Sequence, residues 1–208
     1  MNTDVSPAPL TLYYAPEACS LAPHIVLREL GLPHALSRVD NRAKRSDRGE
    51  DFLAINPKGY VAALKLADGR VLTEGPAILL YLADLKPAAG LAPPAGSWAR
   101  HRLHEWLAFI SAEIHGGFGP LFNTDLEASA RAWWQARLEK RLDYTAAALD
   151  ADDWLLDAGY SVADAYLYTV LRWAPRFGIA LERWPALHAY MARIGQRPHT
   201  LAALQAEA

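Results

Sequence analysis

A segment rich in proline, glycine and alanine, PAAGLAPPAGS at residues 87–97, divides the chain into two halves of different character. Before it, short runs of alternating apolar residues are interleaved with runs in which apolar residues recur every three or four positions. After it only the second pattern is found, as in the spacing of Leu103, Leu107, Ile110 and Ile114. Alternation is typical of strands, and the longer step is typical of helices. The sequence therefore predicts a mixed α/β half followed by an all-helical half.

The first half has the pattern strand, helix, strand, helix, strand, strand, helix. It opens with the apolar run LTLYY, which is expected to be a strand buried on both sides. Asp68-Gly69 predicts a tight hairpin turn between the last two strands. The charged run NRAKRSDRGE at 41–50 is expected to be a loop. This order predicts a four-stranded mixed sheet covered by helices, which is the thioredoxin-like arrangement.

The second half is expected to be a bundle of helices. A long helix is predicted from about residue 127 to 149, and two further helices follow at the end of the chain. Ser161 and Asp164 have the spacing of a capping box before an apolar helix, which is expected at the centre of the bundle. The expected organisation is a disordered leader at 1–9, an α/β domain at 10–86, a linker at 87–97 and an all-helical domain at 98–208.

Composition narrows the range of functions. The 208 residues carry a formal charge of −2 with Lys and Arg scattered along the chain, which gives no electrostatic reason to expect a nucleic-acid partner. No apolar run reaches the roughly 20 residues that span a bilayer, and the first ten residues lack the pattern of a secretory signal. A single cysteine excludes an internal disulfide and favours a reducing compartment. We therefore expect a cytoplasmic protein without a membrane partner.

That cysteine, Cys19, lies between the first predicted strand and the first predicted helix. Unpaired N–H groups and the positive end of the helix dipole at such a position favour the thiolate, which is the reactive form of cysteine. A lone cysteine is also commonly an inert residue packed beneath the end of a strand. Position alone does not choose between a reactive thiol and a packing residue.

Five segments carry a resemblance to a known family: YYAPEACSLAPHIVLRELGL, INPKGYV, LADGRVLTEGPAILLYLAD, EWLAFISAEIH and WLLDAGYSVADAYLY. They occur in order, with natural spacing, over essentially the whole chain after the leader. Together they resemble the cytosolic glutathione transferases, and most closely the bacterial beta class. The resemblance implies a thioredoxin-like domain joined to an all-helical domain. It also implies an enzyme that uses glutathione as co-substrate and holds no bound cofactor.

The resemblance assigns roles to residues around the glutathione sulfur. Cys19 falls on the beta-class cysteine that faces this sulfur and can form a mixed disulfide with it. His115 falls on the histidine that approaches the sulfur, and an imidazole with a pKa near 6.5 can exchange a proton with a thiol. Ser20 supplies the neighbouring hydroxyl, although a helix-capping role suits it equally well. No metal site is implied, because His101 and His104 lack a third ligand.

The resemblance places the rest of glutathione, which is a tripeptide, along the first domain. Glu74 and Gly75 fall where the family holds the γ-glutamyl group, with a carboxylate for the ammonium and helix-start N–H groups for the carboxylate. Val61 falls where the backbone pairs with the cysteinyl unit like an added strand. Lys44 falls in the loop that offers a lysine to the glycyl carboxylate, although a solvated surface lysine is an equal alternative. Glu113 aligns with an acid that reaches the glutathione of the partner subunit in a homodimer.

Several residues depart from the family pattern. The family's cis-proline is replaced by Ala62, and because a cis bond before alanine costs about 2.5–4 kcal/mol, a trans Val61–Ala62 bond is expected. Ala108 and Ala112 replace side chains that bond glutathione. Glu17 replaces a small residue beside the cysteine, where a carboxylate opposes thiolate formation. Each change is expected to weaken glutathione binding.

Two functions follow from these observations. The first is a transferase that conjugates glutathione to a small hydrophobic electrophile, or exchanges thiols with it, as in detoxification. The second is a non-catalytic binding or stress-related protein of the same fold, with weak or no glutathione affinity. The resemblance also implies a two-fold homodimer that joins each N-terminal half to the helices of the other chain. The sequence favours the first function and does not identify the electrophile.

Overall fold

The computed structural model describes residues 10–208, so the predicted leader at 1–9 lies outside the described residues. The first half contains a five-stranded sheet with the order β3-β2-β1-β4-β5. Its strands are β1 (Leu10–Tyr14), β2 (His34–Asp40), β3 (Arg45–Ser46), β4 (Ala63–Lys65) and β5 (Val71–Thr73). β1 and β2 run parallel, whereas the other neighbouring strands are antiparallel. The predicted mixed sheet is confirmed.

The fifth strand, β3, corrects the expectation that residues 41–50 form only a loop. This two-residue strand pairs with the end of β2. Asp40 holds the turn between the two strands, because its carboxylate accepts hydrogen bonds from the backbone N–H groups of Arg42 and Ala43. An aspartate turn of this kind reverses the chain inside a charged segment that composition alone assigns to a loop.

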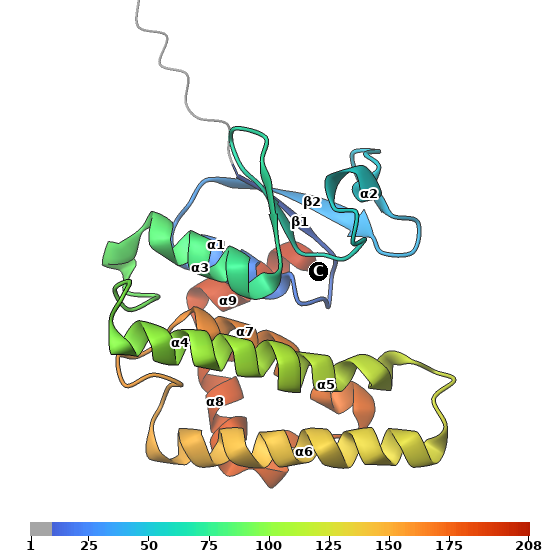
Figure 1. Ribbon diagram of the computed structural model, residues 1–208, viewed down its shortest axis with the longest axis vertical. Coiled ribbons are helices and arrows are strands. Elements are labelled where there is room, and N and C mark those ends of the chain that lie inside the picture. Colours follow the sequence, from blue (N-terminus) through green and yellow to red (C-terminus); the bar gives the residue numbers. More distant parts are fainter. Residues whose placement is uncertain (1–9) are drawn as a thin grey trace, which may run out of the picture.

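Helices cover both faces of the sheet. α1 (Leu21–Glu29) and α3 (Gly75–Leu85) lie between the sheet and the second half, and the short α2 (Phe52–Ile55) lies on the other side (Figure 1). In the central strand, Leu12 belongs to the large core shared with the helices, and Tyr13 belongs to a small core with Phe52. The prediction of a first strand buried on both sides is therefore confirmed.

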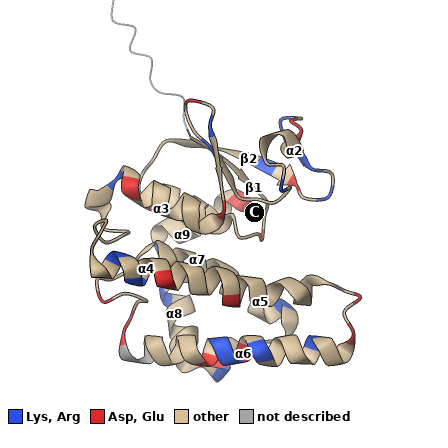
Figure 2. Ribbon diagram, viewed as in Figure 1, with Lys and Arg blue, Asp and Glu red and all other residues tan. Residues whose placement is uncertain are grey.

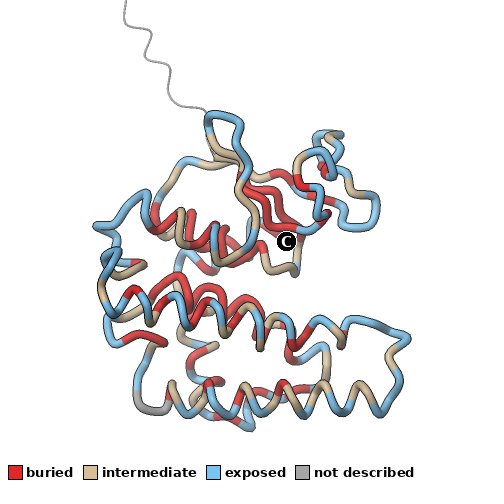
Figure 3. The backbone as a smooth tube through the Cα atoms, in the orientation of Figure 1, coloured by how far each residue is buried: buried red, intermediate tan, exposed pale blue. Residues whose placement is uncertain are grey.

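The second half is helical, as predicted. Its elements are α4 (Trp98–Phe109), a π-helical segment (Ile110–His115), α5 (Gly116–Phe118), α6 (Ala128–Ala151), α7 (Val162–Leu171), α8 (Pro185–Gly195) and α9 (Pro198–Glu207). Every residue of α7 is buried, and Figure 3 shows this helix inside the molecule, so the predicted central helix is confirmed. Its capping box is also present, with the Asp164 carboxylate accepting from the backbone N–H of Ser161 at 2.7 Å.

The last helix, α9, returns to the first half and packs against α1, so the end marked C in Figure 1 lies beside the sheet. There Oε1 of Glu207 lies 2.7 Å from Nδ1 of His24, which is fully buried. Arg28 donates from Nε to the other ring nitrogen of His24 at 2.9 Å. Both nitrogens of a buried imidazole are thus satisfied, one of them from the far end of the chain. The two halves share one continuous apolar core.

Charged side chains of both signs are spread over both halves of the described chain (Figure 2). Within residues 10–208, no helix combines the length and the apolar character needed to cross a bilayer. In the same residues, histidine, cysteine and acidic side chains do not come together in groups of three or more that would suit a metal ion.

Candidate active site

A cavity of about 660 Å³ lies between the two halves of the structure. Its walls come from the β1–α1 loop, the loop before β4, the start of α3, the π-helical segment, α7 and the turn after α7. π-Helical segments are rare and recur at functional sites. Five residues that the sequence nominated line this one cavity: Cys19, Val61, Glu74, Gly75 and His115.

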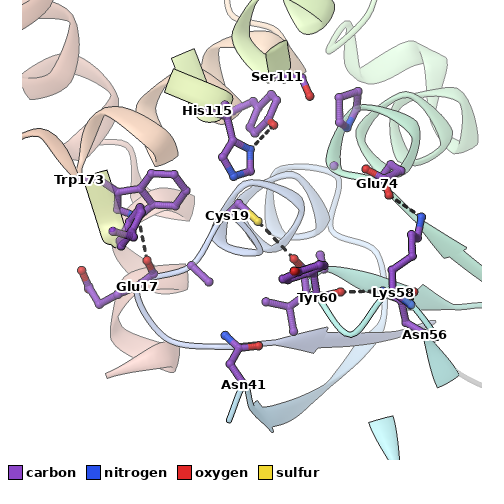
Figure 4. A pocket seen from close by; sticks show the side chains of 18 of the residues that line it. Glu17, Cys19, Asn41, Asn56, Lys58, Tyr60, Glu74, Ser111, His115 and Trp173 are labelled. Atoms are coloured by element: carbon purple, nitrogen blue, oxygen red, sulfur yellow. Dashed lines mark hydrogen bonds and ion pairs between the residues drawn. The ribbon is translucent and has the colours of Figure 1, made fainter. Parts of the chain in front are cut away.

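Cys19 occupies the middle of the cavity wall, two residues before α1 begins (Figure 4). Its Sγ donates a hydrogen bond to the carbonyl oxygen of Val61 at 3.3 Å. Burial raises the pKa of the thiol to about 11, and the charge of Glu74 acts in the same direction. The N–H groups of Cys19 and Ala62 lower the pKa, as expected at a helix start, but their effect is smaller than that of burial. Burial therefore outweighs the expected helix-start effect, and the thiol is protonated at neutral pH.

The Val61–Ala62 peptide bond is cis, so the expectation of a trans bond is wrong. Val61 and Ala62 are both buried, Val61 in the small core and Ala62 in the large core on the other side of the sheet. The local sequence shows only that a peptide bond before alanine intrinsically prefers trans. It does not show how the two residues pack in the folded chain.

Glu74 stands immediately before α3, with a φ of 72° that non-glycine residues seldom adopt. Its carboxylate bonds Nζ of Lys58, which also donates to Oγ1 of Thr73 at 2.7 Å (Figure 4). The next residue, Gly75, lines the cavity where a Cβ atom would come within 3.8 Å of the Tyr166 ring. The start of α3 thus presents a carboxylate and unpaired backbone N–H groups at one end of the cavity.

His115 faces Cys19 from the opposite wall (Figure 4). Its Nδ1 lies 2.6 Å from the hydroxyl oxygen of Tyr166, and its ring packs edge-on against Trp173. Burial lowers the pKa of His115 and raises the pKa of Tyr166 above its ordinary value. At neutral pH the cavity therefore holds a neutral imidazole bonded to a protonated phenol.

Three nominated residues, Ser20, Lys44 and Glu113, lie outside the cavity lining. Ser20 is fully buried, and its hydroxyl donates to the carbonyl of Ala15 and accepts from the N–H of the same residue, both at 3.2 Å. It secures the turn before α1 and makes no side-chain cap. Lys44 donates from Nζ to the carbonyl of Gly59 at 2.8 Å and lies against the ring of Tyr60. Both side chains shape the loops that carry the site rather than facing its interior.

Glu113 also points away from the cavity. It forms ion pairs with Arg141 at 2.7 Å and Arg137 at 3.0 Å, and these guanidinium groups lower the pKa of its carboxyl. Ala108 and Ala112 are exposed and do not line the cavity. In this chain, a side chain at position 108 or 112 would therefore not face the cavity.

Glu17 does not act on the thiol as expected. Its carboxylate pairs with Arg172 at 3.1 Å, and its backbone carbonyl accepts a hydrogen bond from the Trp173 indole at 2.8 Å. The acid whose charge raises the pKa of Cys19 is Glu74 instead. An arginine supplied 155 positions later along the chain compensates Glu17, which the local sequence does not reveal.

Sequence reasoning missed several cavity residues: Asn41, Lys58, Tyr60, Phe122, Tyr166, Trp173 and Arg176. Tyr166 belongs to the apolar helix that the sequence predicts at the centre of the bundle, and the hydroxyl of a buried tyrosine needs a partner, which is a usable signal. Lys58, within the segment INPKGYV, pairs with Glu74 in the cavity, whereas Lys44 bonds the carbonyl of Gly59 outside it. No signal in the sequence predicts that Phe122 and Trp173 lie on the same wall of the cavity.

Two family models match the chain. Residues 18–85 match the model described as the N-terminal domain of glutathione S-transferase. Residues 109–198 match the model described as the C-terminal domain of the same enzymes. The two matched ranges carry all five nominated residues that line the cavity.

Similar proteins align with this chain over almost its whole length. The glutathione S-transferase GstA of Escherichia coli O157:H7 is 46% identical over 198 residues, which are 95% of this chain and 98% of that protein. A sphingomonad glutathione S-transferase, solved in complex with glutathione, is 45% identical with a TM-score of 0.92. A beta class glutathione S-transferase of Sphingomonas chungbukensis is 43% identical with a TM-score of 0.91. Both structures cover 95% of this chain and 98% of their own.

Proposed function

Because the chain belongs to the glutathione S-transferase family, we propose that its cavity joins the sulfur of glutathione to a small hydrophobic electrophile. The protein is a glutathione transferase that uses glutathione as co-substrate and needs no bound cofactor. The non-catalytic alternative is not favoured, since relatives at 46% and 40% identity are glutathione S-transferases. The observation that supports the proposed site best is the meeting of Cys19, His115 and Glu74 in one cavity.

Glutathione is proposed to bind along the first half. The carboxylate of Glu74 pairs with the γ-glutamyl ammonium, and the N–H groups that open α3 donate to the neighbouring carboxylate. The backbone of Val61 pairs with the cysteinyl unit. Lys44 supports this arrangement indirectly, because it holds the carbonyl of Gly59 two residues before Val61. In this position the glutathione sulfur lies between Cys19 and His115.

The protonation states in the cavity favour conjugation over thiol exchange. A Cys19 thiol with a pKa of about 11 is almost fully protonated at pH 7 and is a poor nucleophile. It is instead a hydrogen-bond donor, and the neutral His115 can supply a second donor. Two donors aimed at one sulfur stabilise its thiolate. The thiolate then attacks the electrophilic carbon, a C–S bond forms, the leaving group departs with the bonding electron pair, and the thiol proton passes to water.

Further parts of this proposal concern the assembly and its setting. Glu113 lies outside the cavity lining and its side chain is partly exposed, so it is proposed to reach a partner subunit. We place the enzyme in the cytoplasm as a homodimer that detoxifies electrophiles. We also keep the domain boundaries of 10–86 and 98–208, with 87–97 as the linker.

Calorimetric titration with reduced glutathione, paired with conjugation of 1-chloro-2,4-dinitrobenzene, tests the proposal. We expect dissociation in the micromolar to low millimolar range and measurable turnover. Cys19→Ala and His115→Ala should lower turnover at least tenfold while circular dichroism stays unchanged. A folded protein that gives no heat at several millimolar glutathione, and no turnover, would overturn the proposal.

A further inference from the structure

The charges on the side chains that line the cavity do not cancel, even when their ion-pair partners outside the lining are included. Four charged residues face it: Glu17, Lys58, Glu74 and Arg176. Glu74 and Lys58 pair with each other. Glu17 pairs with Arg172, which lies outside the lining. Among the carboxylates whose side chains the structure describes, none forms an ion pair with Arg176. Arg176 therefore leaves one uncompensated positive charge on the cavity wall.

Arg176 stands over an aromatic surface. It belongs to the turn Ala174–Phe177 after α7, and its guanidinium carbon lies 5.1 Å from the ring centre of Phe122. Phe122 in turn packs against Trp173 with ring centres 5.3 Å apart. Trp173 is buried and fixed by the hydrogen bond from its indole nitrogen to the Glu17 carbonyl. The cavity thus offers a rigid aromatic wall with a guanidinium group at its edge.

This wall lies on the side of Cys19 opposite the proposed glutamyl position. Figure 4 shows Glu74, Lys58 and Asn56 on one side of the thiol and Trp173 on the other. The γ-glutamyl ammonium and carboxylate of glutathione are therefore proposed at the Glu74 and Lys58 end. The aromatic wall and Arg176 are left for the second substrate, whose reacting carbon must approach the sulfur between the two ends.

We propose that this enzyme prefers aromatic electrophiles that carry a carboxylate, with the ring on Trp173 and Phe122 and the carboxylate on Arg176. The inference rests on the proposed transferase function and adds the substrate class. A guanidinium group binds a carboxylate through two parallel hydrogen bonds, and a planar ring packs well on indole and phenyl faces. With 4-chloro-3-nitrobenzoate the glutathione thiolate attacks the carbon that bears chlorine. The C–S bond forms, chloride leaves with the C–Cl electron pair, and the carboxylate is unchanged.

The test compares 4-chloro-3-nitrobenzoate with the neutral 4-chloro-3-nitrobenzamide as substrates of the full-length protein. For each substrate, the kcat/KM of a variant is divided by the kcat/KM of the wild type. This ratio cancels the difference in intrinsic reactivity between the two substrates. Arg176→Gln should lower kcat/KM about tenfold for the benzoate and less than about twofold for the benzamide, because only the benzoate loses a charged partner. Arg176→Lys should restore part of the benzoate activity. Arg183→Gln, which removes an exposed cation outside the cavity, is the matched control and should change neither ratio.

The outcomes separate this inference from the proposed function. Equal loss for both substrates in Arg176→Gln, or no loss for either, overturns the carboxylate preference while transferase activity stands. Turnover of the benzamide without turnover of the benzoate by the wild type overturns it as well. If the calorimeter shows glutathione binding but neither substrate reacts, the substrate class is wrong. If glutathione itself does not bind, the proposed function fails and this inference fails with it.

Discussion

The thiol of Cys19 donates its hydrogen to the carbonyl oxygen of Val61, 42 residues further along the chain. The bond connects the start of α1 to the loop that is proposed to pair with glutathione. A bound thiolate placed between Cys19 and His115 would compete with that carbonyl for the same hydrogen. The thiol donates to a protein acceptor in the structure, and we propose that it donates to the glutathione sulfur in the complex.

The ionisation of Cys19 is the first testable consequence. With a pKa of about 11, only roughly one thiol in 10⁴ is ionised at pH 7 in the free protein. Alkylation by iodoacetamide should be slow at pH 7 and should accelerate about tenfold per pH unit up to pH 10. Because the chain has one cysteine, the difference in absorbance at 240 nm between the protein and Cys19→Ala, in which the tyrosinates cancel, reports the thiolate of this group. A midpoint below pH 8 would contradict the structure.

The pair formed by His115 and Tyr166 gives a second prediction. Burial lowers the pKa of His115, so its imidazole stays neutral until the pH falls below the usual value near 6.5. An NMR titration of the His115 imidazole should therefore show a midpoint below pH 6.5, and a midpoint above that value would contradict the burial of this ring.

Tyr166→Phe removes the hydroxyl partner of that imidazole. We expect a loss of about 1 kcal/mol in the free energy of unfolding and a several-fold lower kcat. Tyr168→Phe, on the same helix but outside the cavity lining, is the control. A Tyr166→Phe variant with unchanged kcat would show that the hydroxyl does not position the ring.

Glu74 gives the third prediction. Its side chain is 67% exposed, so Glu74→Gln should change the free energy of unfolding by less than about 0.5 kcal/mol. The same change removes the charge proposed to bind the γ-glutamyl ammonium, and glutathione affinity should fall about tenfold in calorimetry. Glu182→Gln, at an equally exposed acid outside the cavity, should leave affinity unchanged. Equal affinities in the two variants would remove Glu74 from the site.

The contact between α9 and α1 gives the fourth prediction. Glu207→Ala leaves a nitrogen of the buried His24 without its partner, which should cost about 1–3 kcal/mol in urea unfolding. Glu207→Gln keeps an acceptor and should cost less. Glu182→Ala serves as the exposed control, with a change under about 0.5 kcal/mol. Identical midpoints for all three variants would mean that this buried contact adds no stability.

Local signals in the sequence predict the elements well. The order of elements in the first half predicts a helix after its last strand, and this helix forms over 75–85 with Gly75-Pro76 at its start. The capping box at Ser161 and Asp164 forms as its spacing predicts. Both depend on residues within a few positions of each other, where propensity and hydrogen bonding act directly.

The electrostatics of the site depend on distant residues and could not be predicted. Burial in the folded chain raises the pKa of the Cys19 thiol, whereas the helix-start argument considers only its immediate neighbours. Glu17 is compensated by Arg172 from the other half. Trp173 and Phe122 meet only after the helices have packed. Burial and pairing of this kind are properties of the tertiary structure.

The bond between His24 and Glu207 spans 183 positions, and it determines when folding can finish during synthesis. At the usual 5–20 residues per second, a ribosome needs roughly 10–40 s to reach Glu207 after it has made His24. Throughout that interval the imidazole lacks its carboxylate, and the surface of α1 that α9 covers is open to solvent or to a chaperone. The surface of α1 therefore stays uncovered on the nascent chain until α9 has emerged from the exit tunnel.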